Sequence, residues 1–250
     1  LDDEILNLAK RIHPNLVPVM ERLEFLDDPA VSVWKMDKIP GVGFLEMIHD
    51  DNIKTKLLLT VTDMAEFYIQ AWKIPQIPSR ERVLSVRQEC KTKLKELAKT
   101  SSASLLSHVR QADQALDEIL QLPWVLTHED LSSMNLLLDP STGNLRGVVD
   151  WADAGFWPFG VALWGLESVL GYGGPDGWTW LDDEPRTYRG MFSMTLQTAL
   201  HLPAGDFVTI EKARKLGLLL RYGFIWRDGR PVLTDDTTTL ELFLGRTILT

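Results

Sequence analysis

The chain has 250 residues, of which 45% are hydrophobic, and it carries a formal net charge of −9 with an isoelectric point near 5.1. This length and hydrophobic content predict a soluble globular protein with a substantial core, and the acidic charge argues against nucleic acid or an anionic membrane as the main partner. No apolar run approaches the ~20 residues that a bilayer-spanning helix needs, and a single cysteine, Cys90, fits a reducing compartment such as the cytoplasm.

The first 40 residues have the pattern of a short helix followed by a β-hairpin. An aspartate at position 2 or 3 is placed to cap a helix that ends near residue 12. Alternating apolar residues over 16–26 and 31–36, separated by Asp27-Asp28-Pro29, predict two antiparallel strands. The helix face that we expect to be buried consists of Ile5, Leu8 and Ile12.

Residues 52–122 are expected to form three helices. In 52–72 the apolar residues recur at steps of three and four, which predicts a core helix, and Pro75 follows its end. Residues 80–99 predict a more polar helix with mixed charges, and 102–122 an amphipathic one. Further helical patterns occupy 161–170, 185–202, 205–226 and 238–249, whereas 171–184 is rich in Gly, Trp and Asp and is expected to be a loop.

The candidate catalytic residues lie between positions 124 and 151. Short apolar runs typical of strands cover 124–127, 136–138 and 145–149. The sequence H-E-D-L-S-S-M-N fills 128–135 between the first two runs, and Asp150 directly follows the third. This order predicts a catalytic loop, a strand and a metal-binding carboxylate.

Transfer of a terminal phosphoryl group would explain this spacing. Asp130 would orient the acceptor hydroxyl and accept its proton, while Asn135 and Asp150 would supply oxygen ligands for Mg²⁺ bound to nucleotide phosphates. We interpret His128 as a brace for the loop. An Asp and an Asn that merely cap a turn are the alternative, but the loop and its flanking strands together favour the catalytic interpretation.

These residues resemble the aminoglycoside phosphotransferase family, also called the phosphotransferase enzyme family. Its usual pattern is close to HGDLxxxN followed by IxDWExAxxG. Glu129 replaces the usual Gly, and Ala152 occupies the usual acidic position, with Asp153 one place beyond it. The run AGFWP at 154–158 is similar to fungal members. The matching residues are His128, Asp130, Leu131, Asn135, Val149, Asp150, Trp151, Ala154 and Gly155.

The resemblance implies an α+β, protein-kinase-like fold with two lobes. Residues 1–40 would form an incomplete N-terminal β lobe, with the first helix in the place of helix C, two strands and a hinge. Residues 41–250 would form a mostly helical C-terminal lobe with the catalytic loop, the metal site and the substrate region. The hinge residues expected to meet an adenine are Met36, Asp37, Lys38 and Ile39.

In such a lobe, Glu4 would pair with the phosphate-binding lysine of a preceding strand. The chain contains neither G-x-G-x-x-G nor G-x-x-x-x-G-K-[ST], so we expect a Gly-rich turn and its lysine in a segment before Leu1. Glu4 is equally well explained as an acid favoured by the helix dipole. Residues 36–41, on their own, also fit a plain strand end with a Pro-Gly turn.

By this resemblance the reaction would move the γ-phosphate of ATP or GTP, with Mg²⁺, to a hydroxyl of a small molecule. Carboxylates and tryptophans after Asp150 would frame the acceptor and would suit an amine-bearing compound. Aminoglycosides, choline-like amines, sugars and secondary metabolites are all open as acceptors. A solvated acidic loop with core tryptophans is the alternative for this region. The residues singled out as acceptor contacts are Asp153, Trp157 and Glu167.

Two other functions compete with this interpretation. One is a catalytically silent kinase-like binding protein, or a family member that performs ATP-independent chemistry in the same cleft. The other is a protein kinase, which the sequence disfavours because no D-F-G to A-P-E segment follows Asp150.

Overall fold

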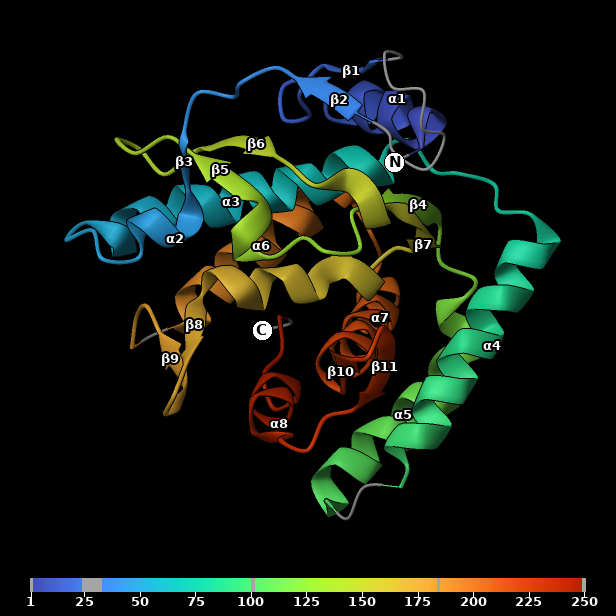
Figure 1. Ribbon diagram of the computed structural model, residues 1–250. Coiled ribbons are helices and arrows are strands. Elements are labelled where there is room, and N and C mark those ends of the chain that lie inside the picture. Colours follow the sequence, from blue (N-terminus) through green and yellow to red (C-terminus); the bar gives the residue numbers. More distant parts are fainter. Residues whose placement is uncertain (1, 24–32, 100–101, 184, 249–250) are drawn as a thin grey trace.

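The computed structural model describes residues 2–23, 33–99, 102–183 and 185–248 (Figure 1). A small N-terminal part with α1, β1 and β2 lies above a larger, mostly helical part. Short two- and three-stranded sheets accompany the helices, as the expected α+β class requires. No helix among the described residues combines the length and hydrophobicity needed to cross a bilayer.

The N-terminal part consists of α1 (Asp3–Ile12) and the antiparallel hairpin of β1 (Met20–Leu23) and β2 (Val33–Met36). Asp2 is the N-cap, because its carboxylate accepts hydrogen bonds from the backbone N–H groups of Glu4 and Ile5 at 2.8 and 3.2 Å. The predicted turn at 27–29 lies outside the described residues. The helix buries Leu6, Ala9 and Ile12, with Ile5 and Leu8 only partly buried.

That buried face is rotated by one residue from the expected one. Ala9 is fully buried, and its small side chain lets the helix approach the core more closely than a face built on Leu8 would. Leu6 then packs into the core from the same side of the helix.

The strands that flank the candidate site form as predicted. β4 (Trp124–Thr127) pairs with β7 (Gly155–Pro158), and β3 (Val42–Gly43), β5 (Leu136–Leu138) and β6 (Leu145–Val148) form an antiparallel sheet in the order β3-β5-β6. The short helices between them are α2 (Phe44–Met47), η1 (Ser133–Asn135) and η2 (Trp151–Asp153). The loop between β4 and β5 and the end of β6 therefore reach the same region.

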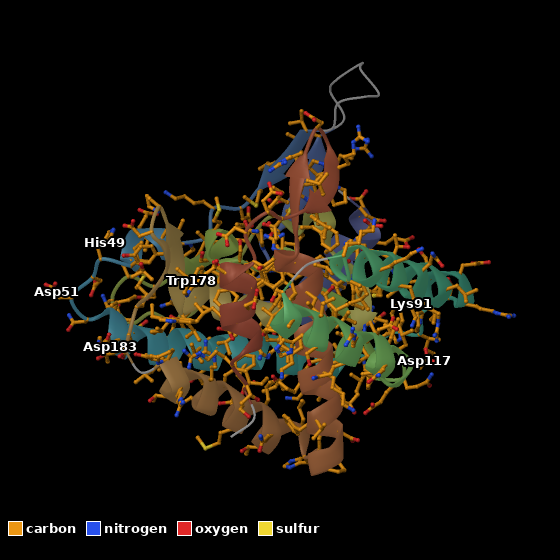
Figure 2. All side chains as sticks on the ribbon, turned by 90° about the horizontal axis from the view of Figure 1, so that it is seen from below. His49, Asp51, Lys91, Asp117, Trp178 and Asp183 are labelled. Carbon is orange, nitrogen blue, oxygen red and sulfur yellow. The ribbon has the colours of Figure 1, made fainter. Side chains whose placement is uncertain are left out.

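Helices supply most of the remaining chain. The predicted core helix is α3 (Ile53–Trp72), and α4 (Arg80–Leu97) and α5 (Ala103–Ile119) run side by side at one edge of the molecule. Ion pairs Lys91–Asp113 and Arg87–Asp117 join the outer faces of α4 and α5, where Figure 2 labels Lys91 and Asp117. The other helices are η3 (Val161–Val169), α6 (Pro185–Leu200), α7 (Ala204–Tyr222) and α8 (Thr238–Leu244).

Two predicted boundaries are wrong. The expected loop at 171–184 contains a hairpin of β8 (Gly171–Gly174) and β9 (Gly177–Trp180), where Gly171 allows close pairing because a Cβ there would lie 2.4 Å from the Thr179 carbonyl oxygen. The helix expected over 205–226 ends at Tyr222 and is followed by the hairpin β10 (Phe224–Arg227) and β11 (Arg230–Leu233). Asp228-Gly229, both at positive φ, forms the tight turn that this hairpin needs.

Two hydrophobic clusters meet at β4. One joins α1, α3, β5, β6, η3 and α6, and the other joins α4, α5, α7 and α8. Val125 and Leu126 belong to the first cluster, whereas Trp124 belongs to the second. The loop that follows β4 is thus anchored by both halves of the core.

Candidate active site

The loop between β4 and β5 brings Asp130 and Asn135 into direct contact. The Asn135 side-chain Nδ2 donates to the Asp130 carbonyl oxygen at 2.7 Å and to Asp130 Oδ2 at 3.1 Å. Backbone hydrogen bonds from Ser132 to Asp130 and from Asn135 to Ser132 close the loop into η1. Because both partners of the amide nitrogen are acceptors, Asn135 Oδ1 is the atom left to bind a ligand.

Asp150 is tied to this loop through the backbone. The N–H of Val149 donates to the Asn135 carbonyl oxygen at 3.0 Å, and His128 Nε2 donates to the Val149 carbonyl oxygen at 2.8 Å. Asp150 itself has φ 63° and ψ 63°, a left-handed conformation that costs a non-glycine residue about 1–2 kcal/mol. Strain of this kind persists only where the surroundings fix the backbone, and here two hydrogen bonds hold the preceding residue.

Aromatic packing holds His128 in place. The Trp151 indole N–H donates to the Val148 carbonyl oxygen at 3.0 Å, and its ring meets His128 edge-on with centroids 4.8 Å apart. On the far side of Trp151, His13 of the N-terminal part stacks on Phe67 of α3 at 3.9 Å. Burial lowers the pKa of His128, and that of His13 to about 4, so both imidazoles are neutral at pH 7. A buried, neutral His128 suits a brace better than a proton carrier.

The oxygen atoms at Asn135 and Asp150 fit Mg²⁺. This ion keeps octahedral geometry and is commonly held by one or two protein oxygens together with phosphates and water. The Asp150 side chain makes no hydrogen bond or ion pair to another described residue, so its carboxylate is free to bind a ligand. In the described part of the chain, no three His, Cys, Asp or Glu side chains are grouped to hold a metal, so phosphate oxygens would have to complete the coordination.

Glu129 occupies a backbone conformation that explains the family preference for Gly. Its φ is 60°, in the left-handed region that favours glycine. The carboxylate packs against Gly155 and Trp157, with Oε1 3.8 Å from Arg82 Nη2. Burial raises the pKa of Glu129 to about 7, although Trp157 and Arg82 act in the opposite direction. A glutamate is accommodated at this position because α4 and β7 surround its side chain.

Sequence reasoning missed Arg221, which contacts Asp130, the candidate catalytic base. Arg221 Nη2 forms an ion pair with Asp130 Oδ1, and its guanidinium carbon lies 4.9 Å from the centroid of the buried Trp164 ring. The two paired residues are 91 positions apart, and Arg221 lies in the last turn of α7. A cation there is ordinarily explained by the helix dipole, so no local signal separates it from a capping charge.

Two of the three predicted acceptor contacts are corrected by the structure. Glu167 is fully buried and forms ion pairs with Arg189 and Arg214, so its carboxylate cannot meet a substrate. Trp157 is 7% exposed and already has Arg82 over its ring at 5.6 Å, so it offers no open aromatic face. Asp153 is exposed in η2, and its contact with an acceptor stays a prediction.

The tryptophans of β9 pack against other aromatic residues instead of framing an acceptor site, as in the alternative interpretation of this region. Trp178 and Trp180 both pack against Phe243 of α8. Trp180 also lies under the Arg189 guanidinium at 4.9 Å. These tryptophans are partly buried and pack against the core.

The predicted hinge runs along the β5–β6 hairpin. Residues 36–38 are exposed, and Ile39 lies over Gly147 of β6, where a Cβ would be only 2.4 Å from Ile39 Cδ1. A glycine at 147 therefore lets the segment approach the hairpin that leads to Asp150. Glu4 is exposed in the first turn of α1. The contacts of Glu4 and of 36–39 with a nucleotide stay predictions.

Comparison with known proteins identifies the family and the fold. The model of the phosphotransferase enzyme family matches residues 7–187. The structure of aminoglycoside phosphotransferase APH(3'')-Id from Streptomyces rimosus, in complex with ADP and streptomycin, is similar with a TM-score of 0.53 and 13% identity, over 87% of this chain and 80% of that one. The GDP complex of aminoglycoside 2'-phosphotransferase-IIIa is similar with a TM-score of 0.51 and 15% identity, over 86% of this chain and 73% of that one.

At these identities the structural likeness concerns the fold alone. None of the curated proteins matches the chain. Nothing in the comparisons supports a fungal source. The match to the family model covers well over half of the chain, and the chain therefore belongs to the phosphotransferase enzyme family, with the two-lobed, protein-kinase-like α+β fold expected from its sequence.

Proposed function

We propose that the protein transfers the γ-phosphoryl group of ATP or GTP to a hydroxyl of a small molecule. The observation that carries this proposal is the direct contact of Asp130 with Asn135, combined with the backbone hydrogen bond from Val149, the residue before Asp150, to Asn135. Family membership supports it, and so do the ADP and GDP complexes of the two similar structures.

In the proposed reaction the acceptor oxygen attacks the γ-phosphorus. The new P–O bond forms as the bond between the γ-phosphorus and the bridging oxygen breaks, and the nucleoside diphosphate leaves with the electron pair. Asp130 receives the hydroxyl proton, and Asn135 keeps its carboxylate oriented. Asn135 Oδ1 and the Asp150 carboxylate would hold Mg²⁺, which would supply neutralising charge for the phosphate oxygens.

The remaining parts of the proposal concern nucleotide placement. We place the base against the backbone of 36–39, between an N-terminal lobe of residues 1–40 and a C-terminal lobe of residues 41–250. Glu4 would pair with a phosphate-binding lysine, and Asp153 would face the acceptor. Cys90 is buried and unpaired, in keeping with a cytoplasmic location.

Two substitutions test the assignment. Asp150→Ala should abolish Mg²⁺-dependent nucleotide binding, measured by calorimetric titration with Mg-ATP and with Mg-GTP. Asp130→Asn should keep nucleotide binding but lose diphosphate release in the presence of acceptors. Asp51→Ala, at an exposed aspartate that Figure 2 labels, is the matched control. Wild-type protein that binds neither nucleotide would contradict the proposal and favour a catalytically silent binding protein.

A further inference from the structure

Arg221 presents a partly open guanidinium next to the proposed catalytic base. Its side chain is 40% exposed, and one amino group, Nη2, pairs with Asp130 Oδ1. The guanidinium makes no other hydrogen bond to a described residue. Three further N–H groups, on Nε and Nη1, are therefore open to a ligand.

The guanidinium is also held in a fixed place. It lies over Trp164, whose ring is buried and meets Tyr222 edge-on at 6.1 Å. Stacking on an aromatic face restricts the arginine to one orientation, so little conformational freedom is lost when it binds a ligand. Such an arrangement suits recognition more than general surface charge.

The two oxygens of Asp130 face different partners. Oδ2 accepts from Asn135, the residue beside Asp150 at the proposed metal site, whereas Oδ1 pairs with Arg221 from α7. Asp130 thus contacts Asn135 through one carboxylate oxygen and Arg221 through the other, so an acceptor whose hydroxyl meets Asp130 would come within reach of the Arg221 guanidinium.

We propose that Arg221 binds an anionic group of the acceptor, and that the acceptor is a small hydroxyl compound with a carboxylate or phosphate near the hydroxyl that is phosphorylated. This inference rests on the proposed function. A guanidinium recognises both anions through paired hydrogen bonds, and it repels an ammonium group at the same distance.

A cation at this position also reduces the electrostatic repulsion that an anionic acceptor meets in the site. An anionic acceptor is repelled by the nucleotide phosphates and by Asp130, and Arg221 offsets that repulsion where it is strongest. The net charge of −9 does not oppose this, because exposed charges beyond about 8 Å are largely screened at physiological salt. The proposal replaces the amine-bearing acceptor expected from the sequence.

Acceptors with one carbon skeleton and different charges provide the test. Diphosphate release is measured with Mg-ATP and Mg-GTP for hydroxy acids, the corresponding hydroxy amides and hydroxy amines, and sugar phosphates beside the free sugars. We expect turnover with an anionic member and not with its neutral or cationic counterpart. The carboxylate and phosphate arms show which anion is used.

Variants of Arg221 show whether this residue makes the distinction. Arg221→Gln should raise the KM for the anionic acceptor at least about tenfold, while the KM for the nucleotide stays within about twofold of the wild-type value. The acceptor KM of Arg221→Lys should lie between those of the wild type and Arg221→Gln. Arg227→Gln removes the same charge from a 57% exposed arginine of β10 and should change neither constant. Thermal unfolding of each variant verifies that it is folded.

Several outcomes would overturn the inference without touching the proposed function. Turnover confined to neutral or cationic acceptors is one, and an Arg221→Gln variant that loses kcat with an unchanged acceptor KM is another. If Mg-nucleotide binds but no acceptor is phosphorylated, the proposed function fails. Titration of the same acids into the Mg-ADP complex then decides the inference, because no binding, or equal binding to Arg221→Gln, refutes it.

Discussion

The backbone N–H of Val149 donates a hydrogen bond to the carbonyl oxygen of Asn135 at 3.0 Å. This bond joins the end of β6 to the loop after β4 without using any side chain of the site. Substitutions of the Asp130 or Asp150 side chain should therefore alter chemistry while this backbone connection stays in place.

Asn135→Ala should lose Mg²⁺-dependent nucleotide binding and also some stability. The change removes the amide that donates to Asp130 twice, and each hydrogen bond contributes about 0.5–1.5 kcal/mol, so we expect a loss of about 1–3 kcal/mol in urea unfolding. Asn135→Asp keeps an oxygen ligand but places two carboxylates together, so metal binding should survive better than stability. Unchanged nucleotide affinity in Asn135→Ala would disprove the metal assignment.

Glu129→Gly should stabilise the protein by about 1 kcal/mol, because glycine adopts φ near 60° without strain. Glu129→Ala removes the same carboxylate but retains the Cβ, so it separates backbone strain from side-chain packing. Chemical denaturation of the three proteins at one pH measures the difference. Equal stability of the Gly and Ala variants would show that the backbone is not strained.

The contribution of Glu129 to stability should fall as the pH rises from about 4.5 to about 7. Its pKa is raised to about 7 in the folded protein from an ordinary value of 4.5, so in this window the folded chain keeps a proton that the unfolded chain has released. Glu129→Gln cannot titrate. The unfolding free energy of the wild type minus that of Glu129→Gln should therefore decrease as the pH rises through this window. A difference that does not change with pH would show that Glu129 has an ordinary pKa.

Glu167→Ala should be severely destabilising, by about 3–5 kcal/mol, because it leaves two buried arginines without their shared partner. Asp153→Ala, at an exposed acid nearby, should change stability little and serves as the control. Urea unfolding measures both. A stable Glu167→Ala variant with a raised acceptor KM would restore the interpretation of Glu167 as a substrate contact.

Gly147→Ala should weaken nucleotide binding through the hinge candidate. A new Cβ would collide with Ile39 Cδ1 and push 36–39 away from β6, at a cost of about 1–3 kcal/mol. The double variant Ile39→Val with Gly147→Ala removes that Cδ1 and should recover part of the affinity. Full affinity in Gly147→Ala would place the nucleotide away from this segment.

The sequence by itself determined the elements around the site. The strands β4, β5 and β6, the loop at 128–135 and the position of Asp150 follow from alternation and spacing within 28 residues, where local backbone preferences dominate. Asp2 as a helix cap is likewise a local property. The family pattern added the fold, because it fixes how these local pieces are usually arranged.

Only the tertiary structure decided which charges meet. Arg221 reaches Asp130 across 91 positions, and Arg214 reaches Glu167 across 47, because α7 packs against η3 in the second hydrophobic cluster. The same packing buries Glu167 in the core, although the sequence had suggested that it contacts the substrate. The role of a charged residue depends on which side chains of other helices lie against it. The spacing of residues along the sequence does not reveal the distance between such side chains.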